Sequence, residues 1–258
     1  MELKSKERID DLQFKNLKII QNENGFCFGI DAVLLSDFAK NLKKANTLVD
    51  FCTGTGIIAI LLSAKVSNLK KIYGVEIQKD VADMARRSVE LNGLQEKIEI
   101  LNKDLKIIDE DLKPGTIDAI TVNPPYKAKN SGIINEEDSL TISRHEVCCT
   151  LEDIIKQSAK LLKFGGNFYM VHRPERLVDI MFYMRKYKVE PKRIRFVHPN
   201  KESVANLVLI EGSRAGRPFL KFEKPLYVYD ENGNYTDEIF EIYNMKNEET
   251  GVSSKRKD

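Results

Sequence analysis

The chain has 258 residues, which is enough for one large domain or two modest ones with a sizeable core. Hydrophobic residues make up 42% and charged residues 31%, an ordinary composition for a soluble protein. The net charge is only +2, so the charge of the whole molecule does not indicate a nucleic-acid partner, and local charge has to decide that question.

No targeting or membrane segment is expected. Residues 1–11 are densely charged and lack the apolar core of a signal peptide, and no stretch approaches the apolar length of a membrane span. The four cysteines, Cys27, Cys52, Cys148 and Cys149, form no C-x-x-C pair and no zinc-ligand spacing. We therefore expect a cytoplasmic protein without a metal site, in which the thiols, including the adjacent Cys148 and Cys149, are reduced and packed.

Predicted strands and helices alternate along most of the chain. Residues 14–30 are predicted to form a hairpin that turns at Asn22–Gly25, and residues 31–41 a short helix. Apolar runs then predict strands at 47–51, 71–77, 97–102, 117–122 and 165–171. Helical patterns predict helices at 56–66, 79–92 and 151–162, the nearly all-apolar first of which should be well buried. The expected helix ends are Asn92–Gly93 and Gly165–Gly166.

The last part of the chain has a different pattern. Residues 193–198 and 206–211 are predicted strands joined by a loop too short for a crossover helix, so this pair is expected to be antiparallel. Residues 227–235 are expected to form a further hairpin around Asn232–Gly233, and the tail at 251–258 is expected to be disordered.

Strand–helix alternation at this spacing predicts βαβ units and a parallel sheet. We expect an α/β fold with a seven-stranded, mostly parallel sheet, an antiparallel strand near the edge and helices on both faces. A hairpin and helix at 1–46 would pack on a core domain at 47–222, and residues 223–250 would form a C-terminal extension.

Polar groups gather where the predicted strands end, which is where active sites lie in such sheets. The first strand ends at Asp50 and continues into Gly54 and Gly56, where the backbone can approach a ligand at a helix N-terminus. The second ends at Glu76, which can accept two hydrogen bonds from a ribose diol. The third ends at Asp104, which can accept from the exocyclic amine of an adenine. Their order and spacing together predict a site for an adenosine-containing ligand.

A dinucleotide-binding enzyme is an alternative, because the run from Gly54 to Ala59 fits the pattern G-x-G-x-x-G/A. Three observations count against it. Asp50 would repel a pyrophosphate, the sheet is expected to finish with an antiparallel pair, and nicotinamide chemistry has no use for the motif at 123–126 described next.

The sequence Asn123-Pro124-Pro125-Tyr126 ends the fourth strand. An exocyclic amine of adenine is a poor nucleophile because its lone pair is delocalised into the ring. Two acceptors placed on its N–H bonds would turn that pair out of the plane. Asn123 Oδ1 can be one acceptor and the Pro124 carbonyl the other, in a direction that both prolines restrict. Tyr126 offers a face for stacking a flipped-out base, so we expect catalysis by orientation and electrostatics, without a covalent intermediate or a metal.

These motifs resemble those of the class I S-adenosylmethionine-dependent methyltransferases, which have a Rossmann-like sheet. The shared motifs are D-F-C-T-G-T-G (50–56), G-V-E (74–76), N-K-D (102–104) and N-P-P-Y (123–126). Within that class the chain is most similar to the bacterial tRNA1(Val) adenine-37 N6-methyltransferase family, over about residues 14–220. That similarity lies in GFCFGIDAVLLSDFA (25–39), SRHE (143–146) and NLVLIEGSRAGRP (206–218).

The resemblance implies a cofactor, S-adenosylmethionine, and a role for each matching residue. Asp50 would hold the methionine amine, Glu76 the ribose hydroxyls and Asp104 the adenine amine. The backbone at Gly54 and Gly56 would pack against the methionine portion. Phe28 and Asp31 would close the methionine side of the pocket, and Asn123 is also expected to bind the cofactor.

Several acceptors other than a tRNA adenine are open, because planar amines and amides all suit the same turn. They are adenine N6 or guanine N2 of rRNA, cytosine N4, and the side-chain amide of a protein glutamine. Glutamine methyltransferases that act on release factors carry a helical N-terminal domain, whereas only 46 residues precede the first core strand here. A compact chain suits a folded RNA, whose target base lies in a loop, better than duplex DNA.

Local charge supports an RNA partner. Residues 185–224 contain eleven Lys and Arg against four Glu, whereas residues 225–250 contain seven acidic residues against one Lys. A basic face formed by Arg193, Arg195, Lys201, Arg214 and Arg217 would contact phosphates, the alternative being a solvated lysine-rich surface. Residues 127–150 are predicted to be a mobile substrate loop. The predicted RNA-binding residues are Lys127, Lys129, Arg144, His145, Arg195 and Arg214, in a protein expected to be a monomer.

Overall fold

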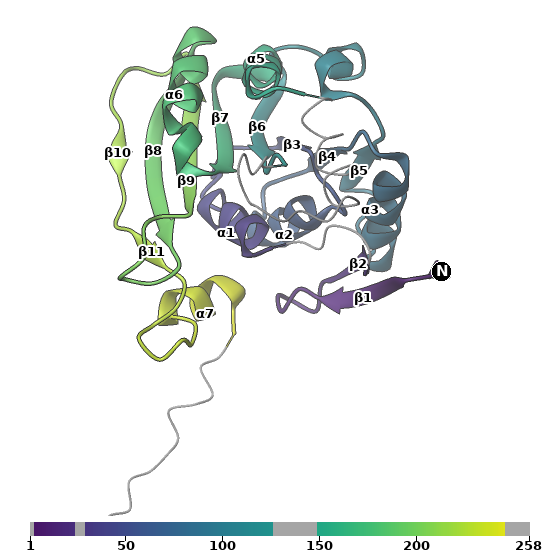
Figure 1. Cartoon of the computed structure of the whole chain (residues 1–258). Coiled ribbons are helices and arrows are strands. Elements are labelled where there is room, and N and C mark those ends of the chain that lie inside the picture. The colour runs from purple at the N-terminus through teal and green to yellow at the C-terminus, as the bar shows by residue number, and fades with distance from the viewer. Residues whose placement is uncertain (1–2, 24–28, 126–148, 246–258) are drawn as a thin grey trace, which may run out of the picture.

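The computed structural model describes residues 3–23, 29–125 and 149–245, and its centre is a nine-stranded mixed sheet (Figure 1). The strands lie side by side in the order β5 (Ile98–Leu101), β4 (Lys71–Val75), β3 (Thr47–Phe51), β6 (Ile117–Val122), β7 (Leu162–His172), β9 (Leu207–Arg214), β8 (Val189–His198) and β10 (Lys221–Phe222), and β11 (Leu226–Tyr227) also pairs with β8. Among the described strands of this sheet, only β9 runs antiparallel to its neighbours. The seven expected strands are therefore β3 to β9, with the antiparallel strand next to the edge as predicted.

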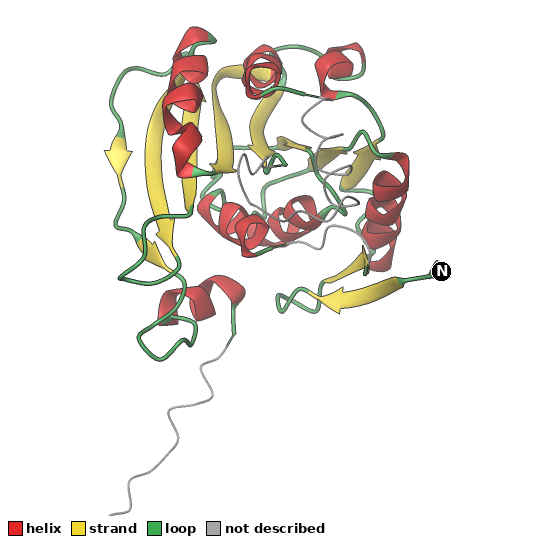
Figure 2. Cartoon of the chain, viewed as in Figure 1, coloured by secondary structure: helices red, strands yellow, loops and turns green. Residues whose placement is uncertain are grey.

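Helices cover both faces of this sheet (Figure 2). One face packs against α1 (Ile30–Phe38), α2 (Ile57–Lys65), α3 (Lys79–Leu91) and α7 (Asp237–Tyr243). The other packs against η1 (Leu105–Glu110), α5 (Leu151–Leu161) and α6 (Leu177–Lys186), and η2 (Pro174–Arg176) leads into α6. None of the helices in the described ranges has the length and apolar composition that a membrane crossing requires.

The two apolar layers follow from the alternation of side chains along each strand. In β3, Leu48 packs into the layer of α1, α2 and α3, whereas Val49 and Phe51 pack into the layer of α5 and α6. Helix α2 is buried from Ile57 to Ser63, as its apolar sequence predicts. Helix α3 buries a single stripe that includes Ala85, as expected for an amphipathic helix.

The parallel strands bring their last residues into one row. Phe51 pairs with Val75 and with Val122, and Val75 pairs with Leu101. The segments that follow β3, β4, β5 and β6 therefore leave the sheet at one edge, which we call the carboxyl edge.

The predicted N-terminal hairpin at 14–30 pairs the wrong segments. The observed hairpin consists of β1 (Glu7–Asp11) and β2 (Lys18–Asn22), so β2 pairs with the segment before it in the chain. The chain turns earlier, through residues 12–17, and residues 24–28 lie outside the described ranges. Strand β1 is charged and shows no apolar alternation. Its position depends on a distant contact, in which Arg87 of α3 donates two hydrogen bonds of 2.6 Å to Glu7.

One other expectation about local structure is wrong. Gly165–Gly166 does not end a helix, because α5 stops at Leu161 and both glycines lie within β7, next to a register shift against β6. Residues 227–235 turn back around Asn232–Gly233 as expected, with an antiparallel bridge between Tyr229 and Tyr235, but the chain before this turn adds to β8 as β11 and α7 follows the turn. The tail at 251–258 lies outside the described ranges.

Candidate active site

Asp50 is the buried polar centre of the carboxyl edge. Its side chain is completely buried, and its two oxygens accept hydrogen bonds from the hydroxyls of Thr53 at 2.6 Å and Thr121 at 2.7 Å. Burial raises the pKa of Asp50 to about 7, against the opposing effect of the two hydroxyls. Asp50 thus supports the turn after β3 from beneath. Its contact with a ligand amine stays a prediction, and the two threonines that hold it were not expected from the sequence.

Glu76 joins the turn after β3 to the end of β4. Gly54 has a φ of +57°, a left-handed conformation that favours glycine, and its N–H donates to Glu76 Oε2 at 3.1 Å. Glu76 Oε1 accepts from the N–H of Gln78 at 2.9 Å. Gly56, the N-cap of α2, follows directly. A carboxylate has about four acceptor positions, so these bonds are compatible with a ribose diol at the same group.

The end of β5 contributes Asn102 and Asp104. Asn102 Nδ2 donates to the carbonyls of Glu76 and Ile77, both at 2.9 Å, and so ties β5 to the segment after β4. Asp104 caps η1 by accepting from the N–H of Lys106 at 2.9 Å. Asn102 belongs to the motif N-K-D (102–104) noted in the sequence, but its hydrogen bonds between the two strand ends were not predicted.

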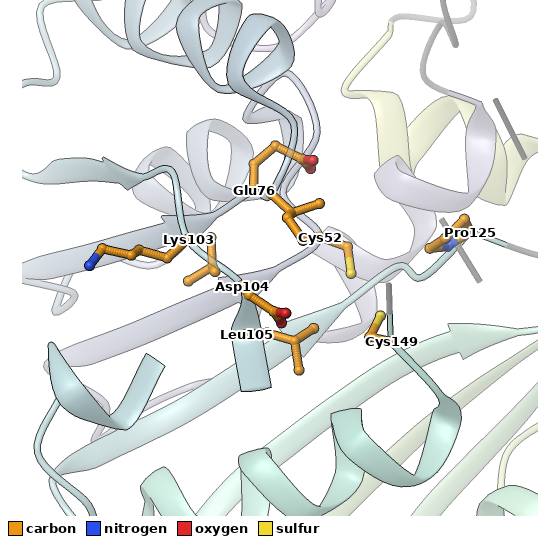
Figure 3. Close-up of a pocket in the computed structure, with 9 residues that line it drawn as sticks. Cys52, Glu76, Lys103, Asp104, Leu105, Pro125 and Cys149 are labelled. Atoms are coloured by element: carbon orange, nitrogen blue, oxygen red, sulfur yellow. The ribbon is translucent and has the colours of Figure 1, made fainter. Parts of the chain in front are cut away.

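A pocket opens between these strand ends (Figure 3). It has about 380 Å³ of empty space, including the part open to solvent. Apolar groups of Val75, Ile77, Leu105 and Pro125 line it together with the carboxylates of Glu76 and Asp104, and Cys52, Lys103 and Cys149 complete the lining. Such a narrow apolar slot with two carboxylates suits a flat ring that carries an amine and a diol. A larger cavity, with about 1050 Å³ of empty space including the part open to solvent, lies at the opposite edge of the sheet, around the start of β7.

Asn123 ends the row at β6, next to the pocket. Its amide Nδ2 donates to Asp31 Oδ2 of α1 at 3.2 Å. Pro124 is buried and Pro125 lines the pocket, whereas Tyr126 lies outside the described residues. The structure thus brings Asp31, Asn123 and Pro125 to one place, although 92 positions separate Asp31 from Asn123 in the chain.

Cys52 and Cys149 meet at the wall of the same pocket. Figure 3 shows their sulfur atoms pointing toward one another, Cys52 from the turn after β3 and Cys149 from the residue before the N-cap of α5. The interaction with Cys149 raises the pKa of the Cys52 thiol, with burial adding to it, and the same interaction lowers the pKa of the Cys149 thiol. The sequence analysis considered Cys149 only with its neighbour Cys148, because nothing in the spacing of Cys52 and Cys149 indicates their contact.

Several predicted site residues cannot be placed. Phe28, expected on the methionine side, falls in 24–28, outside the described ranges. The same holds for the segment 126–148, which contains the predicted RNA-binding residues Lys127, Lys129, Arg144 and His145. Their roles stay predictions.

The other two predicted RNA-binding residues have structural partners. Arg195 is mostly buried and binds the carbonyl of Lys224 and the carboxylate of Glu238, so it joins β8 to α7. Arg214 ends β9 at the edge opposite the site, because β9 is antiparallel, and it donates to the carbonyls of Ala159 and Lys188.

The expected basic face is also largely paired. Arg193 is bound by Glu211 at 2.6 Å and Glu223 at 3.1 Å, and Lys201 lies 3.3 Å from Glu231. Sequence charge counts missed this, because the acidic partners lie up to 43 positions away. Within the described ranges, no three His, Cys, Asp or Glu side chains are placed so that they could hold a metal ion.

A family model, that of the methyltransferase small domain, matches residues 12–186. The chain belongs to the methyltransferase small domain family. Comparison of the fold with solved structures agrees with this family membership. A solved structure described as a predicted O-methyltransferase from Agrobacterium tumefaciens superposes with a TM-score of 0.67 at 21% identity, over 83% of this chain and 95% of that one. A geranyl diphosphate C-methyltransferase from Streptomyces coelicolor superposes with a TM-score of 0.51 at 13% identity, over 70% and 78%. The expected Rossmann-like methyltransferase fold is confirmed.

Curated relatives cover much of the chain. One from Histophilus somni (strain 2336) is 26% identical over 234 residues, which is 89% of this chain and 93% of the relative. Another from Porphyromonas gingivalis (strain ATCC 33277) is 29% identical over 203 residues, which is 75% of this chain and 77% of the relative. Both are named tRNA1(Val) (adenine(37)-N6)-methyltransferase.

Proposed function

We propose that this methyltransferase uses S-adenosylmethionine to methylate the N6 amine of an adenine in tRNA, at position 37 next to the anticodon. The observation that carries the proposal is the Asn123-Pro124-Pro125 turn beside a pocket with the two carboxylates of Glu76 and Asp104. The names of the curated relatives support the tRNA adenine as acceptor.

The residues of the pocket fit the adenosine part of this cofactor. Ile77, Leu105 and Pro125 would enclose the adenine ring, Glu76 would bind the ribose hydroxyls, and Asp104 would accept from the adenine amine. The backbone of Gly54 and Gly56 would follow the methionine portion, above the buried Asp50. Bound there, S-adenosylmethionine supplies a methyl group on a positively charged sulfur, which is the electrophile.

The chain's own contribution to the reaction is orientation. Asn123 Oδ1 and the Pro124 carbonyl would accept the two N–H bonds of the target amine, so that its lone pair leaves the plane of the ring and points at the methyl group. Pro124 is buried at the end of β6, and its ring restricts φ, which keeps its carbonyl in a fixed direction. Rigid acceptors of this kind stabilise the charge that develops on the amine and lose little entropy on binding. The proton released from the amine would pass to water.

The RNA would lie over the carboxyl edge, at the end of β6. Lys127, Lys129, Arg144 and His145 are the proposed contacts, and the paired state of Arg195 and Arg214 argues against a direct role for those two. We expect the protein to be a cytoplasmic monomer that needs no metal for the transfer.

Methyl transfer from labelled S-adenosylmethionine into three separate pools tests the acceptor: total tRNA, rRNA and a protein extract. Label in tRNA that digests to N6-methyladenosine is the expected result. Label in protein as N5-methylglutamine, or in rRNA as methylated guanine N2 or adenine N6, would identify a different acceptor for the same turn. Absence of label from all three pools would contradict the proposed transfer.

A further inference from the structure

The Asp31 carboxylate is held between two partners at the start of α1. Its side chain is buried, with 8% of the residue exposed. Oδ1 accepts from the N–H of Ala32 at 3.0 Å, and Oδ2 accepts from Asn123 Nδ2 at 3.2 Å. One oxygen is therefore tied to the helix that carries Asp31, and the other to the turn that carries the proposed acceptors.

Gly29 makes room for this arrangement. A Cβ atom at position 29 would lie 2.8 Å from Asp31 Oδ1, so an alanine there would force the carboxylate to shift. The helix itself is firmly packed, since Leu34 and Leu35 are buried in the layer shared with α2. The carboxylate is thus presented from a rigid element, which is what the support of a catalytic group requires.

The amide of Asn123 has two ends of almost the same shape and opposite hydrogen-bonding character. A carboxylate only accepts, so the end that faces Asp31 has to be Nδ2, and Oδ1 has to point to the other side of the amide plane. A rotated amide would place Oδ1 against the carboxylate, and two acceptors in contact repel each other. An Asn at position 123 needs such a partner, because only one of its two ends can accept a hydrogen bond from an amine.

We propose that Asp31 is a positioning residue: it fixes the orientation of the Asn123 amide so that Oδ1 accepts from the target amine. This inference rests on the proposed function, and it replaces the contact with the methionine portion that the resemblance implied for Asp31. Asp31 acts on the transfer step through Asn123, and the affinity for the cofactor does not depend on it.

Asp31→Ala and the isosteric Asp31→Asn test the inference. Loss of a charge-assisted hydrogen bond of about 1.5–3 kcal/mol corresponds to a loss of kcat of about 10- to 100-fold. We expect that loss with Asp31→Ala, a smaller one with Asp31→Asn, and a Kd for S-adenosylmethionine within about twofold of wild type in both. Gly29→Ala, which displaces Oδ1, should lower kcat in the same way. Asp37→Asn is the matched control, because it removes a carboxylate from the same helix at a residue paired with Lys40 and Lys65.

The reciprocal exchange is the sharper test. Asn123→Asp alone places two carboxylates against each other and should be less active than wild type. Combining it with Asp31→Asn restores one donor–acceptor pair, and either oxygen of the new carboxylate can then accept from the amine. We expect the double variant to be at least tenfold more active than Asn123→Asp alone. A role of Asp31 that does not pass through Asn123 would give no such recovery.

Three results would overturn the inference. They are unchanged kcat in Asp31→Ala, a tenfold rise in the Kd of S-adenosylmethionine with kcat retained at saturation, and no recovery in the double variant. A side-chain amide NMR signal, assigned to Asn123 by its loss in Asn123→Asp, gives a readout independent of activity. It should shift in Asp31→Asn and not in Asp37→Asn. If the wild type labels no acceptor, the proposed function fails, and an unmoved NMR signal would overturn the positioning role separately.

Discussion

The backbone N–H of Gly54 donates a hydrogen bond to Oε2 of Glu76 at 3.1 Å, across two neighbouring strands of the sheet. Glu76 therefore has two functions in the proposed site. It holds the glycine turn after β3 in shape, and it presents its carboxylate to the pocket.

Glu76→Gln should weaken cofactor binding while the fold is kept. The variant replaces one carboxylate oxygen with an amide nitrogen, which cannot accept from Gly54 or from a ribose hydroxyl. We expect the Kd of S-adenosylmethionine, measured by calorimetry, to rise about 10- to 100-fold. Glu99→Gln removes a carboxylate from an exposed position of β5, where Glu99 pairs with Lys71, and should leave that Kd unchanged. Equal effects of the two variants would show that Glu76 does not bind the ribose.

The pair Cys52 and Cys149 reports on occupancy of the pocket. Because both line it, saturating S-adenosylmethionine should slow the alkylation of Cys149 by iodoacetamide at least about tenfold, as followed by peptide mass spectrometry. Unchanged alkylation would place the cofactor elsewhere.

The same thiols allow a pH experiment. The interaction with Cys52 lowers the pKa of Cys149, so its thiolate should persist to lower pH than that of an ordinary cysteine. Cys52→Ala removes the partner, and the midpoint of the alkylation rate of Cys149 should move to higher pH. Cys52→Ser keeps a hydroxyl donor and should shift the midpoint less. An identical midpoint in all three proteins would contradict the contact.

Asp50 should make stability depend on pH. Burial raises its pKa in the folded state to about 7, from an ordinary value of 3.8, so between these values the folded protein binds more protons than the unfolded one. Its contribution to stability is thus fully present below about pH 4 and is lost as the pH rises through about 7. The Asp50→Asn variant has no carboxyl group to ionise and does not lose stability in this way. The difference between its Tm and that of wild type should therefore increase between pH 5 and pH 8. A difference in Tm that is constant with pH would show that Asp50 is not protonated in the folded state.

Variants at Arg195 and Lys127 should distinguish a residue with a structural role from one that binds RNA. Arg195→Ala breaks the bond between β8 and Glu238 of α7, and a loss of about 1 kcal/mol would lower the Tm by about 2–4 °C without changing the KM for tRNA. Lys127→Ala should raise the KM for tRNA and reduce its dependence on salt, with the Tm unchanged. The opposite pattern would mean that Arg195 contacts RNA and that Lys127 does not.

The core of the fold could be predicted because its signals are local. Strands 47–51 and 117–122 match β3 and β6 residue for residue, since each is an apolar run ended by turn residues. Strand β1 was missed because its sequence has no apolar periodicity. A contact between residues 80 positions apart, Glu7 and Arg87, holds the strand instead.

The same distinction between local signals and distant contacts applies to the residues of the candidate site. Residues at strand ends, such as Glu76 and Asp104, could be predicted to lie together because a parallel sheet brings strand ends together, and both line the pocket. The contacts of Asn123 with Asp31 and of Cys52 with Cys149 could not, because they join segments about a hundred positions apart whose meeting depends on helix packing. The charge count also overestimated a basic surface, since Arg193 and Arg195 bind acidic partners distant in the chain.

The most direct test of the account is methyl transfer to two tRNA1(Val) transcripts that differ only at position 37, adenosine in one and guanosine in the other. Wild-type protein should incorporate about one methyl group into the adenosine transcript, recovered as N6-methyladenosine, and none into the other. Asn123→Ala should lose about 100- to 1,000-fold in kcat on the first while binding S-adenosylmethionine as wild type does, whereas Asn234→Ala, on an exposed turn, should be fully active. Equal labelling of both transcripts, or full activity of Asn123→Ala, would contradict the proposed acceptor or the proposed role of the turn, respectively.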